Sequence, residues 1–172
     1  PVVVRVSESG LLTALAAAGE ADDAQIDAEL ASEDTATGRE RAARAKAARP
    51  TVQAKEAAWA AAVEGSGLPN AVVDAIGQGF SRPGTPADLL RPYVERYHCM
   101  LDTVEERGSH ALVESVVYGF YPRPLVDRDL HDATQAWLDT HPDAPAALRR
   151  LVVENRDPVA RALAAQARDA GA

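Results

Sequence analysis

The sequence is poor in the features that mark secreted and membrane proteins. It has one cysteine, Cys99, so an internal disulfide is impossible and nothing implies an oxidising compartment. No apolar run approaches the ~20 residues of a membrane-spanning helix. The start shows no basic segment followed by a long apolar stretch, so no signal peptide is visible. We therefore expect a cytoplasmic protein without a membrane span.

Catalytic signatures are also missing. The sequence contains no HExxH zinc motif, no GxSxG nucleophile motif and no phosphate-binding glycine loop. His110 and Glu114, four residues apart, could share a helical face, but no third or fourth metal ligand lies nearby in the sequence. Cys99 beside His98 is more typical of a packed cysteine than of a nucleophile, because adjacent helical residues point in different directions. The residues alone thus predict no catalytic group and no metal ligand.

Net charge is −8 and the isoelectric point is near 5.0, which argues against nucleic acid or an anionic membrane as a partner. Charge is polarised near the start, where an acidic segment precedes a basic helix. The acidic residues are Glu20, Asp22, Asp23, Asp27, Glu29, Glu33 and Asp34, and the basic ones are Arg39, Arg41, Arg44, Lys46 and Arg49. Two interpretations stay open: weakly attracting faces of neighbouring helices, or a basic strip that binds an acidic partner or a peptide carboxylate.

Alanine is abundant, at 36 of 172 residues, while aromatic residues make up only 5%. Because alanine is the best helix former and lets backbones approach closely, the composition predicts tightly packed helices. Cap residues and prolines divide the chain into about nine or ten short helices with loops of 2–6 residues. Among the predicted starts are Thr51, Asn70, Ser109 and Asp127, and Asp157-Pro158 is expected to start a separate terminal helix. The sequence predicts an all-α fold of antiparallel helix pairs, and such pairs stacked in a row form a solenoid.

The longest apolar helical stripe lies between Thr85 and Arg107. Its members recur at steps of one, three and four residues, which is the pattern of a buried helix; they are Leu89, Leu90, Tyr93, Val94, Tyr97, Leu101 and Val104. Pro92 removes a hydrogen-bond donor and disfavours helix at Arg91. We expect either a kinked helix or a short helical turn followed by a longer helix from Pro92.

Several stretches, taken in order and spacing, resemble one family. They are Leu11–Gly19, Asp34–Gly38, Ala47–Pro50, Lys55–Trp59, Leu68–Asn70, Pro92–Tyr97, Ala147–Arg150 and Val159–Leu163. Together they look like the C-terminal part of an actinobacterial aminopeptidase N, a zinc-dependent exopeptidase with an endoplasmic-reticulum-aminopeptidase-like C-terminal domain. The likeness covers Leu11 to about Asp169. It departs at residues 1–10, which we expect to be an irregular or introduced lead-in to a single domain at 11–172.

The resemblance implies a non-catalytic, HEAT-like helical domain from a longer hydrolase chain. In the family this domain encloses the active-site cavity over an upstream catalytic domain, which binds the zinc and removes N-terminal amino acids from peptides. The implied partners are that catalytic domain and the peptide substrate, and no family catalytic or metal residue maps onto this sequence. Arg39, Arg41 and Arg44 are the candidate peptide-contacting residues.

The alternative is a free-standing helical-repeat module that binds other proteins. An exposed apolar face on the N-terminal helices would favour a piece of a longer chain, because an independent array needs a polar cap there.

Overall fold

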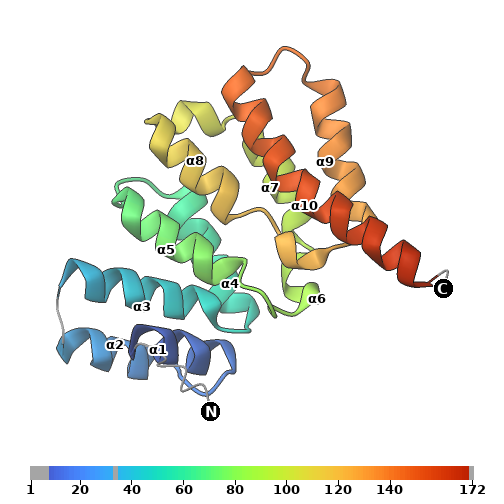
Figure 1. Ribbon diagram of the computed structural model, residues 1–172. Coiled ribbons are helices and arrows are strands. Elements are labelled where there is room, and N and C mark those ends of the chain that lie inside the picture. The colour runs from blue at the N-terminus through green and yellow to red at the C-terminus, as the bar shows by residue number, and fades with distance from the viewer. Residues whose placement is uncertain (1–7, 33–34, 171–172) are drawn as a thin grey trace.

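The computed structural model describes residues 8–32 and 35–170 (Figure 1), and every regular element in them is a helix. The all-α prediction is thus confirmed for the described residues. Residues 1–7 of the expected lead-in lie outside them, and the first helix starts at Glu8. The α-helices are α1 (Glu8–Ala17), α2 (Asp23–Ser32), α3 (Ala36–Ala48), α4 (Val52–Trp59), α5 (Asn70–Phe80), α6 (Ala87–Leu90), α7 (Tyr93–Leu101), α8 (His110–Gly119), α9 (Arg128–Thr140) and α10 (Ala146–Ala170). A π-helical turn (Ala60–Glu64) and two 3₁₀ turns (Val104–Arg107 and Arg123–Leu125) complete the elements.

Side-chain caps start several helices where the sequence predicts them. Thr51 Oγ1 accepts from Ala54 N at 3.1 Å, and Thr35 Oγ1 accepts from Gly38 N at 3.0 Å. Ser109 and Asp127 cap α8 and α9 in the same way. These bonds satisfy backbone N–H groups that have no partner inside the helix. Local sequence therefore determines where these helices begin.

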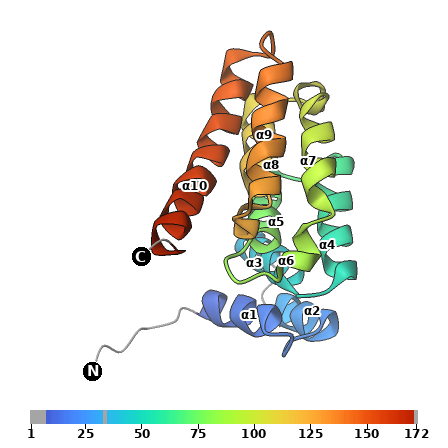
Figure 2. The ribbon, with the colours of Figure 1, turned by 90° about the vertical axis from the view of Figure 1, so that its right-hand side faces the viewer.

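The helices pack in a row (Figure 1). α3 lies against α5, α5 against α8, and α10 against both α8 and α9, while α1 and α2 cover the other side of α3. Figure 2 shows the same order from the side, with α1 and α2 at one end and α9 and α10 at the other. One large core fills most of the row. A smaller one, built on Ala16, Ile26 and Ala45, holds α1 and α2 to α3.

The Thr85–Arg107 segment takes the second of its two predicted forms. A short helix, α6, ends at Leu90, and α7 starts at Tyr93 after Pro92. Tyr93 and Tyr97 are 2% and 0% exposed, so the predicted stripe faces the core. Tyr93 packs edge-on against Phe80, with ring centroids 4.9 Å apart.

Two glycines let α5 contact helices on both sides. A Cβ at Gly77 would lie 2.6 Å from Gly119 Cα in α8, and a Cβ at Gly79 would lie 2.2 Å from Arg44 O in α3. Both distances are far shorter than a carbon–carbon or carbon–oxygen contact allows. The Gly77-Gln78-Gly79 stretch lies in the last turn of α5, as expected of a helix end, and it also sets the spacing of three helices.

The predicted break at Asp157-Pro158 is wrong. α10 continues from Ala146 to Ala170 with Pro158 inside it. Its buried positions run through the proline without a change of face: Leu148, Leu151, Val152, Asn155 and Val159. Burial of this single stripe against α8 and α9 outweighs the hydrogen bond that proline cannot donate.

Because Pro158 is exposed, replacing it should stabilise the chain. Pro158→Ala restores the N–H donor to the Glu154 carbonyl, and we expect a gain of about 1–2 kcal/mol in the free energy of unfolding, measured by urea denaturation. The control is Pro145→Ala, because Pro145 precedes α10 and costs it no hydrogen bond. A loss of stability in Pro158→Ala alone would mean that α10 needs the backbone conformation that the proline imposes.

Two smaller expectations are also wrong. An apolar residue directly after the predicted helix start at Thr51 is expected on the buried side of that helix, but Val52 is 60% exposed at the start of α4. Cys99 was expected to be packed, yet it is exposed, while its neighbour Met100 is 8% exposed and faces the core. At Cys99 the neighbouring Met100 occupies the buried face instead. None of the described helices is both long and apolar enough to cross a bilayer.

Candidate functional site

Helical geometry divides the basic residues of α3 between two sides. Arg39 and Arg41 point about 160° apart, whereas Arg39 and Lys46 lie within about 20° of each other. Arg41 and Arg44 are about 60° apart and share the other side. The candidate peptide-contacting arginines therefore do not form one continuous strip, and their contact with peptide stays a prediction.

Two of the basic residues in and just after α3 form ion pairs with acidic residues of α2. Lys46 Nζ lies 2.6 Å from Asp27 Oδ1, and Arg49 lies 2.7 Å from Asp23 Oδ2, so α3 is tied to α2 by two half-exposed ion pairs. Such pairs contribute ~0–1 kcal/mol each. Arg39 and Arg41 also interact with other groups of the chain. Arg44 differs, because its Nε is buried without a hydrogen-bond partner among the described residues.

An apolar hollow of about 630 Å³ opens beside these ion pairs. We call it the alanine groove, since α3 and α4 line it largely with alanines; its walls are Asp23, Asp27, Ala43, Lys46, Ala47, Arg49, Gln53, Ala54, Ala57, Ala58, Ala61, Leu68, Val72 and Ile76. Leu68 is 37% exposed there. The groove exists because methyl groups stand where larger side chains would fill the space.

Arg96 organises a second surface cluster, between α4 and α7. Its NH1 donates to Glu56 Oε1 at 2.7 Å and its NH2 to Glu64 Oε1 at 3.0 Å. The guanidinium also lies over Trp59 and Tyr93, 5.0 and 4.8 Å from their ring centroids. Hydrogen bonds from Tyr93 and Arg96 lower the pKa of Glu56, so this carboxylate stays charged. Every charge in the cluster is paired, so we interpret it as a structural contact that holds α4 against α7.

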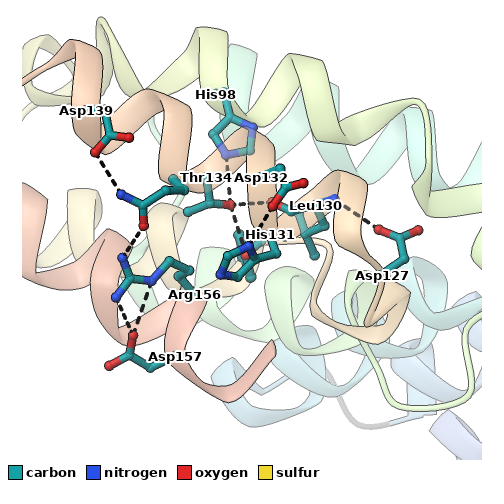
Figure 3. A network of polar contacts seen from close by, with 11 residues as sticks. His98, Asp127, Leu130, His131, Asp132, Thr134, Asp139, Arg156 and Asp157 are labelled. Atoms are coloured by element: carbon teal, nitrogen blue, oxygen red, sulfur yellow. Dashed lines mark hydrogen bonds and ion pairs between the residues drawn. The ribbon is translucent and has the colours of Figure 1, made fainter. Parts of the chain in front are cut away.

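A buried polar network joins α7 to α9 (Figure 3). His98 Nε2 lies 3.1 Å from Thr134 Oγ1, which also lies 3.0 Å from the Tyr121 hydroxyl. A neutral His98 ring donates from Nδ1 to Val94 O at 2.7 Å, and the single hydroxyl proton of Thr134 is donated to Leu130 O at 2.8 Å. Burial lowers the pKa of His98, which favours this neutral form. Thr134 and Tyr121 are both 0% exposed, so the network supports packing.

Arg156 extends polar contacts along the same side (Figure 3). It donates to Gln135 Oε1 at 2.6 Å and to Asp157 Oδ1 at 2.7 Å, and Gln135 in turn donates to Asp139. These contacts hold α9 to α10 next to Pro158. The sequence predicts none of these side-chain contacts.

Lys55 is the main residue that the sequence analysis missed. It is 0% exposed, and its ammonium donates to Ala47 O at 2.6 Å, Phe80 O at 3.1 Å and Gly79 O at 3.5 Å. These carbonyls belong to the last turns of α3 and α5, where a positive charge complements the helix dipole. Burial lowers the pKa of Lys55 to about 8. One signal in the sequence could have indicated its burial. Lys55 lies three and four residues before Ala58 and Trp59, and therefore on the same face of the helix.

No group of three or more metal-ligating side chains occurs in residues 8–32 and 35–170. His110 and Glu114 both lie on α8 and are exposed, and no third ligand joins them in this part of the chain. The described residues therefore do not fit a zinc site.

Two comparisons with known proteins identify the family of this chain. A sequence model of the ERAP1-like C-terminal domain family matches residues 8–161. Aminopeptidase N of Streptomyces lividans is 44% identical over 158 residues, which cover 92% of this chain and 18% of the relative. The chain thus spans less than a fifth of the length of the curated relative that it matches. The resemblance stated from the sequence is confirmed, and the chain belongs to the ERAP1-like C-terminal domain family, as the C-terminal domain of an aminopeptidase N.

Proposed function

We infer that this chain is the non-catalytic C-terminal part of a zinc-dependent, cytoplasmic aminopeptidase, and that it encloses the active-site cavity and limits or holds the peptide substrate. The family match and the identity to Aminopeptidase N carry this proposal. The catalytic chemistry would belong to an upstream domain of the same chain, which is also the proposed main partner. Zinc would bind in that domain, since the described residues offer no ligand group for it.

The proposal includes a HEAT-like, solenoid arrangement of helix pairs. The row α3, α5, α8 and α10, with α4 and α7 behind it and α9 beside α10, is consistent with such stacking (Figures 1 and 2). A stacked row of this kind can curve around a volume, restrict the size of what enters, and keep water from a reacting group. This is the physical basis for an enclosing role.

An exposed apolar face on α1 favours a longer chain over a free-standing module. Leu11 and Leu15, one helical turn apart, are 52% and 36% exposed. A terminal helix of an independent array normally presents a polar outer face, because exposed apolar surface promotes association. Leu11 and Leu15 are suited to contact with further helices of the same protein.

An immunoblot of source-cell lysate with antibody to this polypeptide separates the two functions. We expect a band several times larger than 18.2 kDa. A band at 18.2 kDa with no larger species would instead support an interaction module that acts alone.

Replacing Arg39, Arg41 and Arg44 by alanine in the intact longer enzyme tests the peptide-holding role. We expect kcat/KM for long peptides to fall by about three- to ten-fold while that for dipeptides is unchanged, because loss of a contact to the far end of a peptide affects only peptides that reach it. Arg39→Ala should be compared with Arg41→Ala/Arg44→Ala, since they lie on different sides of α3. The matched control is Arg161→Ala on α10, an exposed arginine at the other end of the row. An unchanged KM and length preference would exclude these arginines.

A further inference from the structure

A hollow of about 430 Å³ opens where α7 and α9 end. The end of α7, the 3₁₀ turn after it and the loop from α9 to α10 surround it, at the upper end of these helices in Figure 2. We call it the terminal hollow, and its walls include Leu101, Asp102, Glu105, Trp137, His141 and Asp143. Leu101 and Leu148, which also line it, are 2% and 3% exposed. Because core residues form part of its walls, the hollow is a preformed surface for a ligand.

Two stacked rings form one wall of the terminal hollow. The ring centroids of Trp137 and His141 are 4.6 Å apart, and their planes differ by 13°. Trp137 Nε1 donates to Asp102 Oδ1 at 2.9 Å, and His141 Nε2 lies 3.4 Å from the same oxygen, so both rings are held in place. Trp137 is 6% exposed, whereas the side chain of His141 is 38% exposed. The accessible ring is therefore that of His141, and a flat group can stack on it.

The other walls carry negative charge. The lining contains four carboxylates, and none of its described residues is a lysine or an arginine. Asp102 is held by Trp137, but the carboxylates of Glu105, Glu106 and Asp143 form no hydrogen bond or ion pair within residues 8–32 and 35–170. Both α7 and α9 end here, and the negative end of each helix dipole adds to the field. The terminal hollow therefore favours a cation.

The arginine that binds the end of α9 does so from outside the hollow. Arg149 of α10 donates to Leu138 O at 2.8 Å and to His141 O, and it is not among the lining residues. Its guanidinium satisfies backbone carbonyls of the last turn of α9. The three unpaired carboxylates are left available to another cation.

The same groups hold a guanidinium elsewhere in this chain. Arg96 lies over the rings of Trp59 and Tyr93 and donates to the carboxylates of Glu56 and Glu64. The terminal hollow offers an accessible ring and carboxylates in the same way, but the described part of the chain supplies no guanidinium to it. A guanidinium suits such a site better than an ammonium, because it is flat, stacks on rings and binds a carboxylate through two parallel N–H groups.

We propose that the terminal hollow binds a guanidinium group, which stacks on His141 and pairs with the carboxylates of Glu105, Glu106 and Asp143. The group comes either from an arginine side chain in the rest of the longer enzyme or from a small free guanidinium compound. The matched residues make up 18% of Aminopeptidase N of Streptomyces lividans, so most of that protein lies outside the matched part. The inference goes beyond the proposed function, which assigns no ligand to this end of the row.

Titration of the ¹⁵N-labelled 172-residue chain with methylguanidinium chloride tests the site. The chain has two tryptophans, so its indole N–H signals give one reporter in the hollow, Trp137, and one outside it, Trp59. We expect the Trp137 signal and the amides of residues 101–106 and 140–144 to shift with millimolar affinity, while the Trp59 signal stays in place. Methylammonium chloride at the same ionic strength should bind at least about three-fold more weakly, because it cannot stack or donate two parallel N–H groups.

A pair of double variants assigns the carboxylates. Glu105→Gln/Asp143→Asn should weaken methylguanidinium binding about five-fold or more, because it removes two of the three unpaired charges. The matched control is Asp74→Asn/Glu114→Gln, which removes two exposed carboxylates outside the hollow and should bind normally. Equal shifts with methylammonium, or equal weakening in both double variants, would overturn the site, since each would indicate attraction to net charge alone.

Thermal denaturation of the intact longer enzyme separates the two sources of the guanidinium. If one of its own arginines occupies the hollow, Glu105→Gln/Asp143→Asn should lower the Tm of the longer enzyme by about 2 °C or more and should not lower that of the 172-residue chain. If a free compound binds, methylguanidinium should raise the Tm of the wild-type longer enzyme and not that of the variant. Neither effect would mean binding at high concentration only and would overturn the proposal. The immunoblot and the length preference of the longer enzyme test the proposed function separately.

Discussion

Gly79→Ala should destabilise the chain by more than about 3 kcal/mol, although alanine is the better helix former. The added Cβ would lie 2.2 Å from Arg44 O, 3.0 Å from Ala48 N and 3.0 Å from Ala47 Cβ. Two of these contacts are backbone atoms of α3, which no side-chain rotation can move away. α3 and α5 must therefore separate, and the contact of Gly79 O with Lys55 would be lost with them. Urea denaturation at neutral pH, followed by circular dichroism, measures the effect.

Gly10→Ala is the matched control, because Gly10 is helical and exposed on α1. There the same substitution should stabilise by about 0.5–1 kcal/mol through the lower backbone entropy of the unfolded chain. Gly77→Ala should behave like Gly79→Ala, since its Cβ would meet Gly119 Cα at 2.6 Å. If Gly79→Ala proved as stable as Gly10→Ala, α3 and α5 would not be packed as closely as described.

Lys55→Met should cost about 3 kcal/mol at pH 7, even though methionine fills a similar volume and is apolar. The change leaves the carbonyls of Ala47, Gly79 and Phe80 without their donor, at ~1–3 kcal/mol for each buried group. It also removes the cost of burying an ammonium, about 3 kcal/mol for a pKa lowered from 10.5 to about 8. The cost of the lost hydrogen bonds is larger than the energy recovered by no longer burying the ammonium. Lys46→Met, which breaks an exposed ion pair with Asp27, should cost less than about 1 kcal/mol as the control.

The difference in stability between the wild-type chain and Lys55→Met should change with pH in a definite direction. Between pH 8 and 10.5 the unfolded chain keeps a proton on Lys55 that the folded chain releases, so the group makes stability rise with pH. In this pH window the free energy of unfolding of the wild-type chain should therefore rise, relative to that of Lys55→Met, by about 1.4 kcal/mol per pH unit. Buried Tyr97 and Tyr121 act oppositely above pH 10, since burial raises the pKa of both phenols, but they do so in both chains and cancel in the comparison. A difference independent of pH from 8 to 10 would contradict a charged, buried Lys55.

Local rules were sufficient for helix starts and for the central stripe. A hydroxyl or carboxylate before an apolar run needs only its own next three residues to form a cap, so Thr51, Ser109 and Asp127 could be identified without any knowledge of the fold. The break before α7 followed equally from the missing N–H of Pro92. The same rule failed at Pro158, because there the burial of residues on both sides of the proline decides whether the helix continues.

The sequence by itself determined the all-helical class, the positions of most caps and, through quoted stretches such as Lys55–Trp59 and Pro92–Tyr97, the family. These depend on contacts within a few residues or on residue identity alone. Only the tertiary structure decided the role of Lys55 and the pairing of Gly77 with Gly119. Each of these depends on which helices become neighbours, and that choice depends on how all the apolar faces pack together.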